Sequence, residues 1–227
     1  MERDSLFLMT DIKLSISIMS SPRAVVVGDV ISTLKTARVF YDRGKCGPWY
    51  NSKRCWIHGA RASGATHHLV IQDDAKLCAQ FEETITSALK TVPDKPVSLY
   101  ANRRAIEVAK ESGADWAVIP DGAWGLGIIL PKPLIYDFLK WEGRHIDPAF
   151  PHDDSRLALW AVETGNHFWC TVPSLIDHAG ASHSTLGNSN SRRVARYYTG
   201  EAKLEWTKKR VNGPSSLNKE YYKYVKK

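Results

Sequence analysis

The sequence feature that most constrains the fold is an apolar run that ends in two adjacent carboxylates, HHLVIQDD at 67–74. A short continuous apolar run of this kind is typical of a strand buried on both faces, which occurs mainly in sheets covered by helices. Asp73 and Asp74 then mark the point where the strand reaches solvent, because unpaired carboxylates are rarely buried. The run therefore predicts an α/β fold in which ligands collect at the carboxyl ends of strands.

Segments with strand and helix patterns alternate along the chain, most clearly in its first half. The predicted strands lie at 12–19, 37–42, 67–72, 96–100, 116–119, 124–130 and 167–178, and the predicted helices at 24–35, 49–58, 79–92, 133–141 and 153–165. Such alternation predicts a mixed, mostly parallel sheet flanked by helices.

Charge divides the chain into two parts. The 227 residues carry 31 Lys and Arg against 24 Asp and Glu, a net charge of +7. Eleven of the basic and three of the acidic residues lie in 189–227, so this segment carries +8 and 1–188 carries −1. We therefore predict one globular domain over 1–188 and a basic, aromatic-rich extension over 189–227, helical at 192–210 and loose beyond Asn212. A localised basic segment favours a polyanionic partner.

Several functional classes are excluded because their motifs are missing from the sequence. It contains no G-x-x-x-x-G-K-[ST], G-x-G-x-x-G, G-x-S-x-G or H-E-x-x-H, which removes the common kinase, dinucleotide-enzyme, lipase and zinc-protease interpretations. The four cysteines lack C-x-x-C spacing, as expected of free thiols in a reducing compartment. We recognise neither a signal peptide nor a membrane span and expect a cytoplasmic protein.

Two adjacent carboxylates at a strand end suit the binding of a hard divalent cation. Mg²⁺ and Mn²⁺ prefer carboxylate oxygens and keep positions open for substrate phosphates. One of Asp73 and Asp74 could reach such a metal while the other orients a sugar or a metal-bound water. The alternative is structural, with one acid capping the following helix and the other solvated.

The segment HHLVIQDDAKLCAQF resembles the metal-binding segment of GT-A glycosyltransferases, in which a strand ends in a D-x-D-type acidic motif. Gln72 stands at the first acidic position of that motif and Asp74 at the second. The resemblance therefore implies that Asp74 binds Mn²⁺ or Mg²⁺ and that Asp73 contacts the sugar or a group beside the metal. It covers about residues 12–188 and implies a GT-A-like, Rossmann-like domain with a nucleotide-sugar donor, a UDP-sugar by expectation.

A second acidic pair opens the predicted helix in PHDDSRLALW. Inverting GT-A enzymes carry a catalytic carboxylate in a pair of this kind, so the resemblance implies that Asp154, or else Asp153, is the general base for the acceptor hydroxyl. Inversion of the anomeric configuration is expected only if one of these acids is the base. Helix capping is the structural alternative, because Asp is favoured at helix N-termini.

The segment VPSLIDHAGASHSTLGN contains a late histidine followed by a Gly- and Ser-rich loop. Many GT-A enzymes bring such a histidine to the metal or the diphosphate, and the resemblance implies this role for His178. A neutral imidazole can bind the metal, whereas a protonated one can counter the charge of the leaving diphosphate. A purely structural histidine is the alternative.

Polar residues near the first two predicted strands are expected to hold the nucleotide. Ser21 and Arg23 follow the first strand, and Asp42 ends the second, where the resemblance implies a contact to the ribose or base. Arg54 could reach a phosphate from the next helix, with a solvated helix charge as the alternative. Trp124 in DGAWGLGIIL could stack on the donor sugar or the acceptor, with a core position as the alternative.

These features together predict a metal-dependent transferase of hexosyl or pentosyl groups. The acceptor that we favour is a hydroxymethylated pyrimidine in DNA, because the chain resembles phage-encoded transferases with a QDD-type motif and its basic extension suits phosphates. Such a protein would act in the host cytoplasm. A surface glycan or lipopolysaccharide is the alternative acceptor. A two-carboxylate phosphodiesterase or nuclease, and a non-enzymatic nucleic-acid-binding protein, are the alternatives of other classes.

Overall fold

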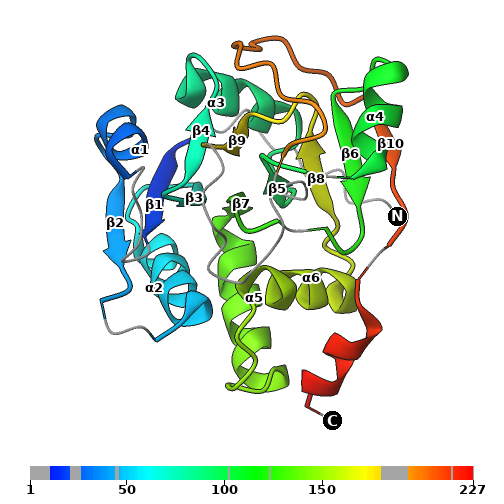
Figure 1. Cartoon of the computed structure of the whole chain (residues 1–227). Coiled ribbons are helices and arrows are strands. Elements are labelled where there is room, and N and C mark those ends of the chain that lie inside the picture. Colours follow the sequence, from blue (N-terminus) through cyan, green and yellow to red (C-terminus); the bar gives the residue numbers. More distant parts are fainter. Residues whose placement is uncertain are drawn as a thin grey trace.

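The computed structural model describes residues 11–20, 27–43, 46–101, 103–122, 124–179, 194–215 and 217–226. These form an eight-stranded main sheet with the strand order β10-β6-β8-β5-β7-β3-β1-β2 (Figure 1). Its strands are β1 (Leu14–Ser20), β2 (Arg38–Tyr41), β3 (His67–Gln72), β5 (Val97–Ser98), β6 (Trp116–Ile119), β7 (Gly127–Pro131), β8 (Phe168–Thr171) and β10 (Arg210–Asn212). Among the described residues, four of the seven strand pairs of this sheet are parallel.

Helices cover both faces of this sheet, and alternate residues of each strand pack toward opposite faces. On β3, Leu69 and Ile71 join a core with α3 (Phe81–Thr91), and Val30 of α1 (Val27–Thr33) belongs to the same core. Val70 joins the opposite core. The helices of that second face are α2 (Pro48–Arg61), α4 (Arg104–Glu111), α5 (Lys132–His145) and α6 (Asp153–Thr164). The predicted fold class, a mixed and mostly parallel sheet flanked by helices, is confirmed.

A small second sheet lies beyond the end of β3. Its two strands are β4 (Ala75–Leu77) and β9 (Ile176–His178), which pair antiparallel with Ala75 opposite His178. The sequence predicts one late strand over 167–178, but the structure divides it between β8 of the main sheet and β9 of the small one. Pro173 lies between them and has no N–H for a strand ladder, which is consistent with the break. Neither β4 nor α4 was predicted, since both are short.

The extension does not fold as the sequence predicts. The expected helix at 192–210 is wrong over the described residues 194–210, where Gly200 has a positive φ of 75° and Arg210 begins β10. β10 adds to the main sheet by pairing in parallel with β6. The chain beyond Asn212 is also ordered against the body, because the 3₁₀ helix η2 (Lys219–Tyr224) brings Tyr224 onto Phe150 with ring centroids 4.4 Å apart.

The extension covers a part of the sheet that α1 and α3 leave open. Trp206 packs on Trp116 of β6 at 5.3 Å between centroids, and Trp116 in turn contacts Trp169 of β8 at 5.9 Å. Figure 1 shows this segment, coloured orange to red, running past β6 and β10 to the neighbourhood of α6. No helix among the described residues is long and apolar enough to cross a membrane.

Candidate active site

The small sheet brings Asp74 and His178 together, although 104 residues separate them in sequence. Asp74 lies between β3 and β4, and its backbone carbonyl accepts a hydrogen bond of 2.8 Å from the N–H of Ala179, just after β9. His178 Nδ1 lies 3.2 Å from Asp74 Oδ2, and their side chains keep 12% and 17% of their exposure. The pairing of β4 with β9 therefore fixes one carboxylate and one imidazole side by side.

Asp74 and His178 are the residues that would hold a divalent cation, since a carboxylate and a neutral imidazole can both bind a metal. In this structure His178 Nδ1 and Asp74 Oδ2 lie within hydrogen-bond distance of each other, at 3.2 Å. No group of three or more His, Cys, Asp and Glu side chains in the described ranges is arranged to hold a metal ion. Two protein ligands would leave the other positions to water and to substrate oxygens, which is how proteins commonly bind Mg²⁺ beside phosphates.

The second acidic pair lies at the N-terminus of α6 and is desolvated. Burial raises the pKa of Asp153 to about 7, and the neighbouring charge of Asp154 adds to the effect. Burial also raises the pKa of Asp154, against the opposing effect of the N–H of Ser155, which donates to Asp154 Oδ1 at 2.7 Å. Asp153 is buried and Asp154 keeps partial exposure. A raised pKa suits a group that accepts a proton near neutral pH.

Gly125 is where the two acidic segments meet. A Cβ at this position would lie 3.0 Å from Gln72 Nε2, 3.6 Å from Asp153 Oδ2 and 3.7 Å from the Cβ of Asp154. The end of β3 and the start of α6 therefore approach each other across a loop that has no side chain at the closest point. This proximity could not be read from the sequence, since about 80 residues separate the two acidic pairs.

Trp124 and Arg103 extend the same region toward His178. The Arg103 guanidinium lies over the Trp124 ring, with its carbon 4.5 Å from the ring centroid. Arg103 Nε and Trp124 Nε1 are buried, and neither has a hydrogen-bond partner among the described residues. Tyr100 contacts His178 edge-on at 5.4 Å between ring centroids. Sequence reasoning missed Arg103 and Tyr100, although Tyr100 ends the predicted strand 96–100 and Arg103 follows it, where the rule about strand ends would have found them.

The predicted nucleotide residues lie near the ends of β1 and β2. Asp42 accepts hydrogen bonds from the N–H groups of Cys46 (3.0 Å) and Gly47 (3.1 Å), so it also positions the start of α2. Arg54 donates to the carbonyl of Tyr41 at 3.1 Å. Ser21, Arg23 and the loop after Ala179 lie outside the described residues. The nucleotide roles of Asp42, Arg54, Asp73 and Trp124 stay predictions.

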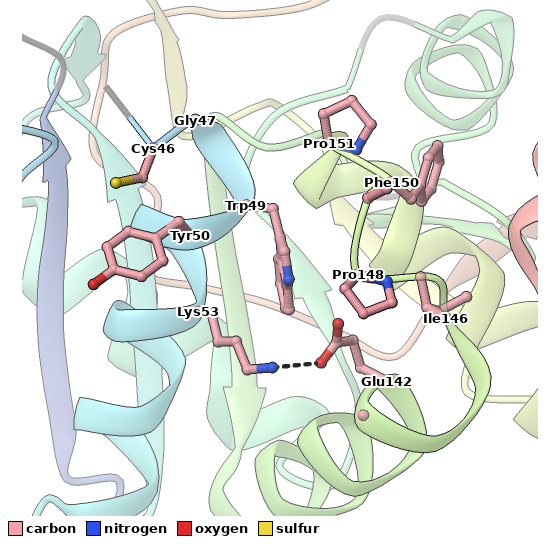
Figure 2. Close-up of a pocket in the computed structure, with 12 residues that line it drawn as sticks. Cys46, Gly47, Trp49, Tyr50, Lys53, Glu142, Ile146, Pro148, Phe150 and Pro151 are labelled. Carbon is pink, nitrogen blue, oxygen red and sulfur yellow. Dashed lines mark hydrogen bonds and ion pairs between the residues drawn. The ribbon is translucent and has the colours of Figure 1, made fainter. Parts of the chain in front are cut away.

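A cavity of about 670 Å³ opens between α2 and the segment that joins α5 to α6 (Figure 2). Its lining residues come from these two regions and are Cys46, Gly47, Trp49, Tyr50, Lys53, Glu142, Gly143, Ile146, Pro148, Ala149, Phe150 and Pro151. Lys53 and Glu142 pair within it at 3.0 Å. Sequence reasoning missed this cavity, because its walls come from segments about 100 residues apart that show no shared motif.

No protein-family model and no curated protein matches this sequence. Among solved structures, the chain is similar to a glycosyltransferase involved in the glycosylation of the major capsid of PBCV-1. The identity is 10% and the TM-score is 0.38, over 79% of this chain and 97% of that one. A likeness at this level assigns neither a family nor an activity to the chain.

Proposed function

We propose that this protein is a metal-dependent glycosyltransferase that moves a sugar from a nucleotide-sugar, a UDP-sugar by expectation, to an acceptor hydroxyl. One observation carries the proposal: a carboxylate–imidazole pair suited to a divalent cation and a desolvated acid pair lie on segments that meet around Gln72 and Gly125. Donor binding and proton removal are the two tasks that such a transfer requires.

On the donor side, Asp74 and His178 would hold Mn²⁺ or Mg²⁺. The cation, when bound, neutralises the charge that develops on the diphosphate as it leaves. Asp73, buried at the end of β3, would contact the sugar or a group beside the metal. The Arg103 guanidinium, which lies over the Trp124 ring, adds a positive charge to the same region.

On the acceptor side, Asp154 is our preferred base. Its carboxylate takes the proton of the acceptor hydroxyl while that oxygen forms a bond to the anomeric carbon, and the bond from this carbon to the diphosphate oxygen breaks. A direct displacement of this kind inverts the anomeric configuration. Asp154 is preferred over Asp153 because it keeps partial exposure, whereas Asp153 is buried.

For the acceptor, a hydroxymethylated pyrimidine in DNA and a glycan are the two candidates. The +8 charge of 189–227 supports DNA. The aromatic residues of this segment support it less, because Tyr198, Trp206 and Tyr224 are used in packing against the body, while Tyr222 is 39% exposed. A base within a duplex would also have to be flipped out of the stack.

A two-metal phosphodiesterase is a weaker interpretation of the same residues. Metal ligands must be deprotonated, but desolvation raises the pKa values of both Asp153 and Asp154. An acid pair that retains protons near neutral pH is better suited to proton transfer than to a second cation.

The test is a thermal-shift panel of nucleoside diphosphates and nucleotide-sugars, each with and without Mn²⁺. We expect at least one diphosphate to raise the melting temperature in the presence of Mn²⁺ and not in its absence. Stable transfer of labelled sugar to a hydroxyl acceptor would then separate a transferase from a hydrolase. If no nucleotide gives metal-dependent stabilisation, the proposed function is wrong.

A further inference from the structure

We infer that the cavity between α2 and α5 is the acceptor subsite of this enzyme and that it takes an uncharged carbohydrate. This inference rests on the proposed function and extends it, because it places the acceptor in a defined cavity and names its chemical class. A nucleobase in DNA is the competing occupant.

The location of the cavity is the first reason. Its wall formed by 146–151 leads directly into α6, so Pro151 lies two residues before Asp153. Its opposite wall is the first half of α2, where a hydrogen bond from Ser52 acts on the Asp153 carboxyl and lowers its pKa against the larger effect of burial. Both walls therefore converge on the acid pair, and an acceptor held between them would present a hydroxyl near Asp154.

The lining of the cavity is the second reason. Figure 2 shows Trp49 and Tyr50 on the α2 side and Pro148, Phe150 and Pro151 on the other, with Lys53 and Glu142 between them. Tyr50 keeps 53% of its exposure, whereas Trp49 and Phe150 are buried, so Tyr50, Pro148 and Pro151 supply the exposed apolar surface. Aromatic and proline surfaces with a few fixed polar groups match a sugar ring, which has apolar C–H faces and hydroxyls at its edge. The volume of about 670 Å³ is that of a small-molecule site rather than a groove for a duplex.

The charge of the cavity is the third reason, and it argues against DNA. Lys53 and Glu142 are the basic and acidic side chains of its lining, and they pair at 3.0 Å. Within the lining these two charges cancel, while Arg156, behind the wall, also pairs with Glu142. A nucleic-acid path requires basic side chains that neutralise phosphates, whereas a neutral glycan requires donors and acceptors such as this Lys–Glu pair supplies.

The wall at 147–151 is also preorganised. Arg156, which is fully buried, forms an ion pair with Glu142 and donates hydrogen bonds to the carbonyls of Asp147 (3.0 Å) and Pro148 (3.1 Å). Its guanidinium carbon lies 4.5 Å from the Trp49 ring centroid. One arginine therefore ties α5, α6 and the loop between them to α2, which holds the cavity open without a ligand.

Gly143 offers a direct way to block the cavity. It lies on α5 in the lining, and a Cβ added there would meet no heavy atom within 4 Å. Gly143→Trp would therefore fill the space without a backbone clash, and Gly143→Ala is the matched control. Because Gly143→Trp could still fail to fold, Tyr50→Ala provides a second variant at an exposed residue, matched by Tyr222→Ala at the exposed tyrosine of the extension.

The experiment measures transfer from the nucleotide-sugar that binds best with Mn²⁺ to two sets of probes. These are neutral trisaccharides of glucose, galactose, mannose and N-acetylglucosamine, and DNA that contains hydroxymethylcytosine. Metal-dependent hydrolysis of the donor without acceptor is followed in parallel, since it reports the donor site alone. We expect transfer to at least one neutral trisaccharide. Gly143→Trp should raise its KM at least about 10-fold and Tyr50→Ala about 5-fold, with donor hydrolysis within about 2-fold of the wild type for both.

Two results would overturn the inference. One is saccharide transfer that Gly143→Trp leaves unchanged in a folded variant. The other is transfer to DNA alone that is reduced by Tyr222→Ala and not by Tyr50→Ala. Absence of both metal-dependent donor binding and donor hydrolysis in the wild type would overturn the proposed function itself, which separates that failure from a misplaced acceptor.

Discussion

The two carboxyl groups at the start of α6 determine the pH range in which the proposed chemistry can occur. Burial raises the pKa of both, that of Asp153 to about 7, so part of the pair is protonated near neutrality. Asp154 accepts a proton only when it is ionised, and because burial raises its pKa we expect the transfer rate to rise with pH until Asp154 has lost its proton. Protonated Asp153 relieves the repulsion that two adjacent carboxylates would otherwise exert in a desolvated site.

The first prediction concerns Asp153→Asn and the pH dependence of stability. Because the folded pKa of Asp153 is raised, its contribution to stability is complete below its ordinary value of 3.8 and is lost as the pH rises through about 7. Asn imitates the protonated form, so the melting temperature of the variant relative to the wild type should increase from pH 5 to pH 8. The variant is compared with the wild type at each pH because buried His67 and His68, whose pKa values burial lowers, make both proteins more stable as the pH rises. A difference that is constant with pH would contradict the prediction.

The second prediction concerns Asp74→Asn, which removes the carboxylate beside His178. Loss of a partner in a metal's outer shell typically reduces affinity or activity about 10- to 100-fold, and loss of a direct ligand should reduce transfer by at least about 100-fold. The thermal shift caused by a nucleoside diphosphate with Mn²⁺ should disappear, while the melting temperature without ligand should change little. Glu83→Gln, an exposed acid of α3, is the control. An unchanged Mn²⁺-dependent shift in Asp74→Asn would show that the metal, if bound, lies elsewhere.

At the residue scale, the sequence indicated individual candidate residues but not the contacts between distant segments. Asp73, Asp74 and the α6 acids were found because they end or begin elements with strong patterns. Arg103 could have been found after the predicted strand 96–100, but its contact with Trp124, on a separate loop, leaves no local pattern. The distance between Gln72 and the α6 acids depends on Gly125 and on the packing of three segments, and no local pattern encodes it.

At the scale of elements, the extension behaves as part of the sheet. Asp115, at the start of β6, accepts hydrogen bonds from Lys203 Nζ (2.5 Å) and from the N–H and hydroxyl of Thr207 (2.6 and 2.7 Å). Burial alone would raise the pKa of Asp115, but these hydrogen bonds outweigh it, and the pKa is lowered. One carboxylate therefore anchors the segment that places Trp206 over Trp116.

The third prediction is that Asp115→Asn loosens this anchor. Loss of the charged acceptor should lower the free energy of unfolding by about 1–3 kcal/mol at pH 7, as measured by denaturant unfolding. Because the folded pKa is lowered, this contribution exists above the ordinary value of 3.8 and is lost as the pH falls through the folded pKa. The variant and the wild type should therefore converge in acid.

The control for this anchor is Asp94→Asn. Asp94 forms an exposed ion pair with Lys95, in which Oδ2 and Nζ lie 2.7 Å apart. Exposed pairs contribute about 0–1 kcal/mol, so a small effect is expected. Equal losses in both variants would show that the Asp115 contacts contribute no more than a surface pair.

The difference between the predicted and the observed extension has a physical cause. Its spacing of apolar residues is compatible with a helix, but Trp206 packs on Trp116 of the distant strand β6, which in turn contacts Trp169 of β8. Gly200 at positive φ also interrupts a helix. By contrast, α6 was predicted well because its acids and its final Gly165 mark both ends locally.

At the scale of the whole molecule, charge and packing in the extension must be tested separately. Removing 194–227 would also remove β10 and expose Trp116, so a loss of DNA binding in such a truncation would not identify a DNA contact. Substitutions of exposed lysines avoid this difficulty. Lys208, Lys219 and Lys226 are exposed and lie on the described part of the extension.

The fourth prediction uses the triple variant Lys208→Gln, Lys219→Gln and Lys226→Gln to test the DNA acceptor. If these lysines neutralise phosphates, the slope of log affinity against log salt should become shallower by about 0.9 per lost contact, up to about 2.7. The melting temperature and the Mn²⁺-dependent nucleotide shift should stay at wild-type values, because the substituted side chains lie outside the donor region. Fluorescence anisotropy with a labelled duplex across a salt series measures the slope. If the salt slope is unchanged and saccharide transfer is normal, the charge of the extension has no role in acceptor binding. That result would favour the cavity between α2 and α5 as the acceptor site.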